Sequence, residues 1–230
     1  FNRNRFNMNL KNAYWYFTGR LGDRFCNDVI QHANSKKELV AITGDTSKKV
    51  KKRTKKKLNN EGISDSITKK ELKDLKKHRD SNVVWLEDRW IYEEIAPFFH
   101  MANENAGWNF EFDFFESMQF TKYKLNQFYN WHHDPFPEPY NTPNNPNYHG
   151  KTRKVSGIVQ LSDPKDYKGG RLEIQPRMTQ DPKLVLNTDK HFKPRGSVII
   201  FPSHLWHRVK PVTKGTRYSL VIWALGKPFK

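Results

Sequence analysis

The feature that most constrains this chain is a change in the spacing of its apolar residues near residue 110. Phe110, Phe112 and Phe114 alternate with polar neighbours, which is typical of a strand with one buried face. Further short apolar runs follow, separated by clusters of Pro, Gly, Asn and Asp: Met118–Lys124, Val155–Leu161, Arg171–Gln175, Ser197–Phe201, Trp206–Lys210 and Thr216–Ala224. Short strands at this spacing favour a sandwich or jelly-roll barrel, so we predict a mainly β core over residues 110–226.

Two apolar stripes with helical spacing precede this core. Leu21–Asn34 is expected to form a helix that buries Phe25, Val29 and Ile30. Asp88–Asn105 is expected to form a second helix, kinked by Pro97, with an apolar stripe of Trp90, Ile91, Ile95, Phe98 and Ala102. We expect both helices to pack against the outside of the barrel in an α+β fold.

No internal repeat or linker divides the chain, so we predict a single domain. Its parts are a helical support (1–44 and 80–109), a basic insert (45–79) and the β core (110–226). The single cysteine, Cys26, excludes an intramolecular disulfide framework and a Cys-rich zinc site, and we expect it to be a buried helix residue. No apolar stretch approaches the ~18 residues of a membrane span. We therefore expect a soluble, cytoplasmic protein without a membrane partner.

The positive charge is concentrated in the insert. The chain has 41 Lys and Arg against 24 Asp and Glu, a formal charge of +17, and residues 48–79 alone carry +10 of it. Residues 45–60 are almost free of apolar side chains and are expected to form a mobile loop, whereas residues 64–78 could form one short amphipathic helix. Two interpretations stay open: a solvated insertion, or an electrostatic funnel for an acidic partner or a nucleic acid.

The β core also contains residues suited to bind a metal ion. In an extended segment, His132 and Asp134 point to the same side while His133 points away. His207 is followed ten residues later by Arg217. If a strand, a turn near Val212 and a return strand join them, they sit opposite each other on one face. The barrel interior would then hold two imidazoles and a carboxylate, with a cation close by.

This set of side chains indicates a particular kind of metal chemistry. Two neutral imidazoles and one carboxylate define the facial triad that favours non-haem Fe(II) and leaves three coordination positions open. Arg217 suits a bidentate pair with the distal carboxylate of a dicarboxylate co-substrate. His204 competes with His207 as a ligand, but it lies thirteen residues before Arg217 and breaks the pairing. Lys214 is a second candidate for the carboxylate anchor.

Several ordered motifs resemble the Fe(II)/2-oxoglutarate-dependent dioxygenases, and within them the prolyl 4-hydroxylase-like (PKHD-type) branch. The match covers roughly residues 118–223. It rests on the segments Gln119-Phe120-x-x-Tyr123, Phe128-Tyr129-x-Trp131-His132-x-Asp134, Leu161-Ser162-Asp163-Pro164, Tyr167-x-Gly169-Gly170-x-Leu172, Phe201-Pro202-Ser203 and His207-Arg208-Val209 through Leu220.

The resemblance implies a double-stranded β-helix that needs Fe(II), 2-oxoglutarate and O2, with ascorbate as the reductant that rescues oxidised iron. It implies iron ligands at His132, Asp134 and His207, an anchor for the far carboxylate of 2-oxoglutarate at Arg217, and further pocket residues at Tyr123 and Trp223. Collagen-type prolyl hydroxylases use Lys as the anchor, so Arg217 fits the bacterial and oxygen-sensing branches. Gly169-Gly170 is expected to form a turn or bulge before the next strand.

Three functions remain open from the sequence. The resemblance favours hydroxylation of a prolyl residue in a peptide or protein, with a proline-rich or acidic substrate. A nucleic-acid-modifying oxygenase would explain the basic insert, but that branch carries a second arginine shortly after its anchor and none follows Arg217. A non-catalytic binding module on the same fold is the third. The Pro- and Asn-rich segment Pro135–Thr152 is expected to be a loop over the iron.

Overall fold

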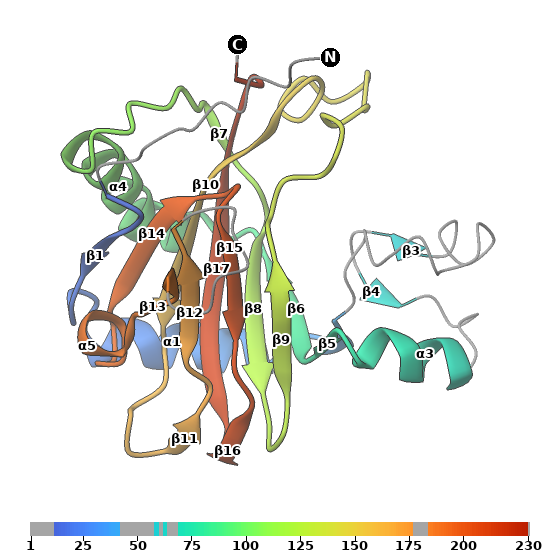
Figure 1. Ribbon diagram of the computed structural model, residues 1–230, viewed down its shortest axis with the longest axis vertical. Helices are drawn as coiled ribbons and strands as arrows, with labels where there is room; N and C mark the ends of the chain where they lie inside the picture. Colours follow the sequence, from blue (N-terminus) through green and yellow to red (C-terminus); the bar gives the residue numbers. More distant parts are fainter. Residues whose placement is uncertain (1–11, 42–57, 60–61, 64–68, 177–183, 230) are drawn as a thin grey trace.

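Two antiparallel sheets and the helices outside them make up the fold. The computed structural model describes residues 12–41, 58–59, 62–63, 69–176 and 184–229 (Figure 1). The helices are α1 (Asp23–Asn34), α3 (Lys69–Lys76), α4 (Arg89–Asn105) and α5 (Asp189–Phe192). The predicted Leu21–Asn34 and Asp88–Asn105 helices are thus confirmed as α1 and α4, each starting one or two residues later.

The larger sheet contains eight strands in the order β1-β14-β10-β17-β8-β6-β2, with β7 also paired to β17. Their bounds are β1 (Trp15–Phe17), β2 (Leu39–Val40), β6 (Asn82–Leu86), β7 (Phe114–Phe115), β8 (Met118–Tyr123), β10 (Thr152–Gln160), β14 (Val198–Pro202) and β17 (Arg217–Gly226). The long central strands β10 and β17 pair along most of their length, from Thr152↔Gly226 to Gln160↔Ser219, with one irregularity between Arg153 and Val155.

The smaller sheet faces the larger one. It contains five strands in the order β13-β12-β15-β9-β5. Their bounds are β5 (Arg79–Asp80), β9 (Phe128–His132), β12 (Leu172–Gln175), β13 (Leu186–Asn187) and β15 (Trp206–Val209). Two short two-stranded sheets join β11 (Tyr167–Gly169) to β16 (Val212–Gly215), and β3 (Leu58–Asn59) to β4 (Gly62–Ile63).

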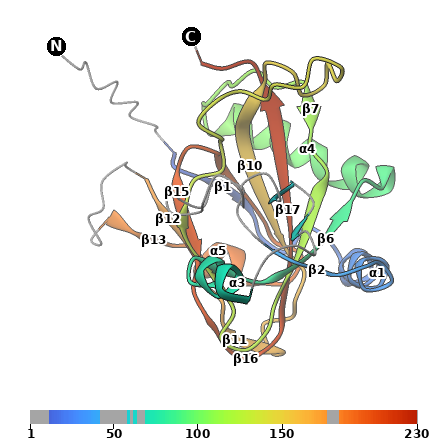
Figure 2. The same ribbon diagram turned by 90° about the vertical axis from the view of Figure 1, so that its right-hand side faces the viewer.

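The larger sheet is buried on both faces because its side chains alternate between two cores. On β17, Leu220, Ile222 and Ala224 join the core that includes α1 and α4 residues such as Val29 and Ile95. The opposite face packs toward the smaller sheet, where residues such as Ile199 and Phe201 of β14 meet Ile174 of β12. Figure 2 shows α1 and α4 on one side of the larger sheet and strands of the smaller sheet, such as β12 and β15, on the other. The predicted mainly β, jelly-roll core with outer helices is confirmed.

Two details of the predicted apolar patterns are wrong. The alternation of Phe110, Phe112 and Phe114 does not mark a long strand, because only Phe114–Phe115 pairs, with β17. The side chain of Asn103 takes the place of a ladder: its Nδ2 donates to the Phe110 carbonyl and its Oδ1 accepts from the Phe110 N–H, both at 2.9 Å. On α4, the buried positions are Ile91, Ile95, Phe99 and Ala102, whereas Trp90 is exposed.

The predicted hairpin between His207 and Arg217 is also wrong. Instead of turning directly back, the chain after β15 forms β16, which pairs with β11. Arg217 then begins β17 in the larger sheet, while His207 stays in the smaller one. The two side chains therefore line one cavity from different sheets and are not neighbours within one ladder.

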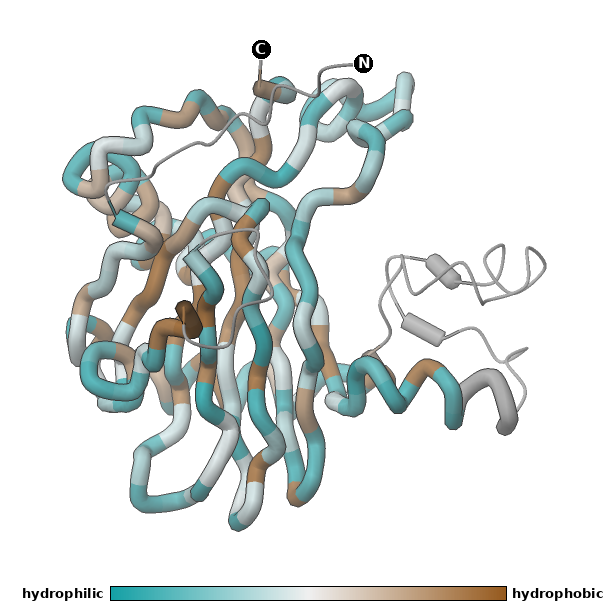
Figure 3. Tube along the Cα trace, viewed as in Figure 1, coloured by the Kyte–Doolittle hydropathy of each residue, from teal (hydrophilic) through white to brown (hydrophobic). Residues whose placement is uncertain are grey.

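The insert is described only in part. Most of the predicted mobile loop lies outside the described residues, except that Leu58–Asn59 pairs with Gly62–Ile63. Within the predicted 64–78 helix, Lys69–Lys76 is helical and Leu75 is buried, while residues 64–68 lie outside the description. The described part of α3 is largely hydrophilic, whereas the sheet strands mix hydrophilic and hydrophobic residues along their length (Figure 3). None of the described helices is long and apolar enough to cross a membrane.

Candidate metal centre

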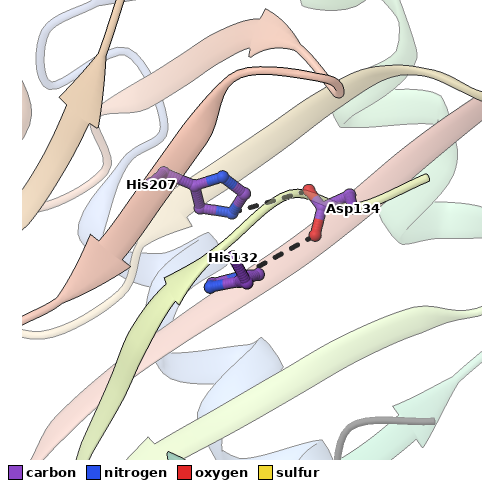
Figure 4. Close-up of side chains that lie close together, drawn as sticks. All are labelled: His132, Asp134 and His207. Carbon is purple, nitrogen blue, oxygen red and sulfur yellow. Dashed lines mark ion pairs between the residues drawn. The ribbon is translucent and has the colours of Figure 1, made fainter. Parts of the chain in front are cut away.

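Three potential metal ligands meet between the two sheets. His132 ends β9, Asp134 follows two residues later, and His207 lies on β15 directly opposite His132 in the ladder. His132 Nε2 lies 3.8 Å from Asp134 Oδ1, and His207 Nε2 lies 3.6 Å from Asp134 Oδ2 (Figure 4). All three ligand atoms fall within 4.8 Å of one another, and no other such group occurs among the described residues.

Backbone carbonyls orient both imidazoles toward this point. Each Nδ1 faces the carbonyl oxygen two residues earlier: Asn130 at 2.8 Å for His132, and Leu205 at 3.0 Å for His207. A carbonyl can only accept, so Nδ1 carries the proton and Nε2 keeps its lone pair for a metal. Burial lowers the pKa of His132 well below its usual value, assisted by the neighbouring His207. The neutral ligand form of His132 is therefore favoured.

The carboxylate and the rings are held by neighbouring side chains. Ser156 Oγ donates to Asp134 Oδ2 at 2.6 Å and lies 2.8 Å from Ser203 Oγ, while the Asp134 N–H donates to the Ser203 carbonyl at 3.0 Å. Tyr129 stacks on His132 with ring centroids 3.4 Å apart and planes at 10°. These contacts fix the ligands before any ion arrives, as metal sites require.

The donor set fits an iron ion. Ligand atoms about 2.1 Å from one ion are separated by roughly 3–4 Å, so the observed spacings need little adjustment. Two imidazole nitrogens and one carboxylate are the ligands of the facial triad preferred by non-haem Fe(II). The triad adjoins a cavity of about 900 Å³, so the remaining coordination positions would face open space.

A buried cation lies in the same cavity. Arg217 is 1% exposed, its Nη1 is 3.5 Å from Ser219 Oγ, and its guanidinium carbon is 5.7 Å from the centre of the Tyr123 ring. Within the described part of the chain, no carboxylate pairs with Arg217. A buried charge without a partner is costly, so this position is suited to bind an anion. Tyr123 faces Arg217 across the β8–β17 ladder, and burial raises the pKa of its hydroxyl.

Strand β17 runs along the cavity from one end to the other. Its alternate residues Arg217, Ser219, Val221 and Trp223 all line the cavity. Trp223 pairs in register with Ser156, which binds Asp134, so it lies at the metal end. Arg217 begins the strand six residues earlier, about 20 Å along an extended chain. The cavity thus has an anion-binding end at Arg217 and a second compartment next to the triad at Trp223.

The other predicted residues fall outside the ligand cluster. His133 is exposed and lies edge-on to Trp206, as its position next to a ligand implies. His204 packs against Phe229 and is not part of the cluster. Lys214 is exposed on β16 and does not line the cavity, unlike Arg217.

The loop after Asp134 forms a wall of the cavity. Pro135, Phe136, Tyr140, Thr142, Asn145 and Tyr148 all line it. The Tyr140 hydroxyl donates to buried Glu116, and the same carboxylate accepts from Arg153 Nε at 2.5 Å. Arg153 in turn lies over Trp223, with 3.8 Å between its guanidinium carbon and the ring centre. A chain of contacts thus connects the loop to the metal end of the cavity.

Sequence reasoning missed several residues of this site. Ser156 and Ser203 support the carboxylate, Trp85 lines the cavity beside Trp223, and Arg79 lies over Tyr129 at 4.4 Å from its guanidinium carbon to the ring centre. Arg79 belongs to the basic insert, yet it is buried. Tyr129 and Ser203 carried a sequence signal, because each lies in a motif that resembles the family; Ser156, Trp85 and Arg79 reach the site through strand register.

Comparisons with known proteins agree with this geometry. The 2OG-Fe(II) oxygenase superfamily profile matches residues 118–225. A PKHD-type hydroxylase of Pseudoalteromonas atlantica is 34% identical over 106 residues, which cover 46% of this chain and 41% of that protein. One from Gloeothece citriformis is 44% identical over 70 residues, covering 30% of this chain and 28% of that protein. The chain therefore spans less than half the length of these curated relatives.

Solved structures share the fold over nearly the whole chain. A viral collagen prolyl hydroxylase of Paramecium Bursaria Chlorella virus-1, in complex with 2OG, has a TM-score of 0.56 and 18% identity, covering 94% of this chain and 97% of that chain. A Pseudomonas putida prolyl-4-hydroxylase has a TM-score of 0.56 and 16% identity, covering 93% of each chain. A Trichoplax adhaerens prolyl hydroxylase, solved with a hypoxia inducible factor peptide fragment, has a TM-score of 0.55 and 14% identity, covering 93% of this chain and 84% of that chain.

At 14–18% identity, the likeness to solved structures establishes the jelly-roll fold alone. The profile match concerns the strand-rich part of the chain. Residues 118–225 of this protein are similar to the 2OG-Fe(II) oxygenase superfamily.

Proposed function

We propose that this protein is an Fe(II)- and 2-oxoglutarate-dependent dioxygenase that hydroxylates a prolyl residue in a peptide or protein. The observation that carries the proposal is the shared cavity of the His132–Asp134–His207 triad and the unpaired Arg217. The named relatives support it, since both curated proteins are PKHD-type hydroxylases and all three solved structures are prolyl hydroxylases.

In this proposal, the two ends of the cavity have separate tasks. His132, Asp134 and His207 hold the iron, which with 2-oxoglutarate and O2 supplies the oxidising chemistry for hydroxylation of a C–H bond. Arg217 pairs with the far carboxylate of 2-oxoglutarate, and the Tyr123 hydroxyl lies in the same compartment. Because burial raises the pKa of Tyr123, this hydroxyl keeps its proton and can donate to the carboxylate.

The substrate enters from the metal end. Trp223 lines the cavity beside the triad, and the loop containing Phe136 and Tyr140 walls it from solvent. Trp131 and Trp206 also line this compartment, where aromatic faces suit a prolyl ring. We infer a peptide or protein substrate, and the peptide bound to the Trichoplax adhaerens prolyl hydroxylase supports that class. Ascorbate as reductant and a cytoplasmic location stay predictions from the sequence.

A paired measurement of co-substrate binding and turnover tests the proposal. Anaerobic Fe(II) and 2-oxoglutarate should give a weak visible charge-transfer band, which Arg217→Ala should weaken by raising the dissociation constant of 2-oxoglutarate. Lys214→Ala is the matched control, because Lys214 is an exposed cation three residues away. No band in the wild-type protein, or equal effects of both substitutions, would contradict the proposed co-substrate site.

A screen of product masses then tests the substrate class. Proline-rich and acidic peptides are compared with single-stranded DNA and RNA as stimulators of succinate formation. Gain of one oxygen atom on a peptide supports prolyl hydroxylation, whereas loss of a methyl group from an oligonucleotide would identify the nucleic-acid alternative. His207→Ala should abolish turnover and His204→Ala should preserve it, because only His207 belongs to the ligand cluster.

A further inference from the structure

Two indole N–H groups in the cavity have no hydrogen-bond partner. Trp85 on β6 and Trp223 on β17 both line the cavity, with ring centroids 6.2 Å apart and planes at 40°. The Nε1 atoms of both residues are buried and unpartnered among the described residues. Buried donors are nearly always satisfied in folded proteins, so two orphans in one compartment require an explanation.

The charged groups next to these indoles are mostly engaged with other side chains: Arg79 Nη2 donates to Gln119 Oε1 at 2.7 Å, and Gln119 pairs in register with Trp85. Arg153 lies over the Trp223 ring at 3.8 Å, but its charge is balanced by Glu116, whose Oε2 is 2.5 Å from Arg153 Nε. The Arg153–Glu116 pair therefore holds the Trp223 ring in place without offering a free charge. An indole N–H is itself a neutral donor and cannot accept. The compartment is thus suited to a neutral acceptor oxygen next to a flat or apolar group.

The position of Trp85 and Trp223 relative to the proposed iron ligands indicates which molecule supplies the acceptor oxygen. Trp223 is opposite Ser156, which binds Asp134, and Trp85 is joined to the same sheet through its pairing with Gln119. Arg217 marks the other end of the cavity, where we placed the co-substrate. An acceptor at Trp85 and Trp223 would therefore belong to the substrate and lie near the reacting C–H bond.

We propose that Trp85 and Trp223 form a substrate subsite whose indole N–H groups bind a backbone carbonyl oxygen of a peptide. The inference rests on the proposed function and deepens it by naming the group that is recognised. An amide suits the site because its oxygen satisfies the donors while the adjacent planar group, or a prolyl ring, packs on the indole faces.

The subsite can be observed directly by NMR of the indole N–H groups. The full chain is loaded with Zn(II) in place of iron and with 2-oxoglutarate, so that no turnover occurs. The probes are N-acetyl-Ala-Pro-Ala-amide and a thymidine trinucleotide. Single Trp→Phe variants assign the indole signals among the seven tryptophans. The peptide should shift the signals of Trp85 and Trp223 and leave that of Trp90, on the outer helix α4, in place.

Kinetics give a second readout that does not depend on assignment. Trp85→Phe and Trp223→Phe keep an aromatic ring and remove only the donor, and each should raise the KM for the best peptide of the turnover screen about three- to tenfold. The dissociation constant of 2-oxoglutarate, measured from the charge-transfer band, should stay the same in both variants. Trp90→Phe is the control and should leave both constants unchanged, because Trp90 does not line this cavity.

Each result decides between the two proposals. If the peptide moves both indole signals but is not oxidised, the subsite stands and the proposed function fails. If a peptide is hydroxylated while neither signal moves and both Phe variants keep the wild-type KM, the subsite fails and the function stands. Signals that do not respond to the peptide at any concentration, or that respond to the trinucleotide instead, also overturn the subsite.

Discussion

Ser156 is the residue on which the carboxylate ligand depends most directly. Its Oγ donates to Asp134 Oδ2 at 2.6 Å, on the ligand side that faces His207. Ser156→Ala removes this donor, so we expect metal affinity to fall by about 10–100-fold, as for other supports of metal ligands. Titration with Co(II) as a spectroscopic substitute measures the change. Ser35→Ala, on the exposed end of α1, is the control; equal affinities for both variants would show that Ser156 does not support the ligand.

Gly170 leaves the space that Arg217 occupies. Its φ of +62° is in the left-handed region, and a Cβ there would lie 2.8 Å from Arg217 Cδ. Gly170→Ala should therefore raise the dissociation constant of 2-oxoglutarate and lower the free energy of unfolding by about 1–3 kcal/mol. Calorimetry and urea unfolding measure the two effects. Gly22→Ala has nothing within 4 Å of its added Cβ and should leave the dissociation constant of 2-oxoglutarate unchanged; a Gly170 variant with normal affinity would contradict the proposed crowding.

At the scale of single residues, the closeness of His132 to Asp134 was predictable from the sequence, and most supporting contacts were not. His132 and Asp134 could be predicted because residues two apart in an extended segment share a face. Ser156 and Trp85 could not, since they reach the site only through the register of β10 against β17 and of β6 against β8. Nothing local in the sequence encodes that register, which is fixed by long-range pairing.

Among the elements, the loop after Asp134 is held to the body of the protein by a few side chains, among them the Tyr140 hydroxyl and Lys151, whose Nζ lies 2.6 Å from Asp113 Oδ1. Tyr140 donates to buried Glu116, and its backbone pairs with Lys151 and Gly150 at 2.9 Å each. Tyr140→Phe should lower the free energy of unfolding by about 1.5–3 kcal/mol, the usual contribution of a hydrogen bond to a charged group. We expect faster amide exchange across the loop and a higher KM for the peptide. Tyr16→Phe, on an exposed ring, is the control, and unchanged exchange in the Tyr140 variant would show that the hydroxyl does not hold the loop.

The elements also show why the predicted topology was only partly right. Apolar alternation located β8, β10, β12, β14, β15 and β17, because buried strands need apolar side chains whichever sheet they join. It could not assign them to sheets, and the segment Val212–Gly215, interpreted as a turn, is a strand paired with Tyr167–Gly169. In the insert, too, residue types alone do not show which side chains are buried. Leu75 and Arg79 are buried despite their lysine-rich surroundings, so a deletion of the insert that extends through residue 80 would remove part of the core.

For the whole molecule, the net charge of +17 says less about the reaction than the placement of buried groups does. Arg217 is the cation that the proposed co-substrate would meet, and it lies outside the basic insert. Partly buried histidines are a second set of residues whose placement matters for the whole molecule. Burial lowers the pKa of His78, His132 and His204, with assistance from Arg79 for His78, from His207 for His132 and from His133 for His204. Each is thus harder to protonate in the folded protein than in the unfolded chain.

This difference makes the metal-free protein sensitive to acid. Below the unfolded pKa of about 6.5, the unfolded chain binds more protons than the folded one, so the free energy of unfolding should fall as pH decreases. The slope reaches at most about 1.4 kcal/mol per pH unit for each histidine, and less for the half-buried His78 and His204 because solvent screens them. Urea unfolding at a series of pH values measures it. His204→Gln should flatten the profile below pH 6.5 and His149→Gln, on an exposed loop, should not. A free energy of unfolding that stays constant or rises on acidification would show that the burial of these imidazoles does not govern stability.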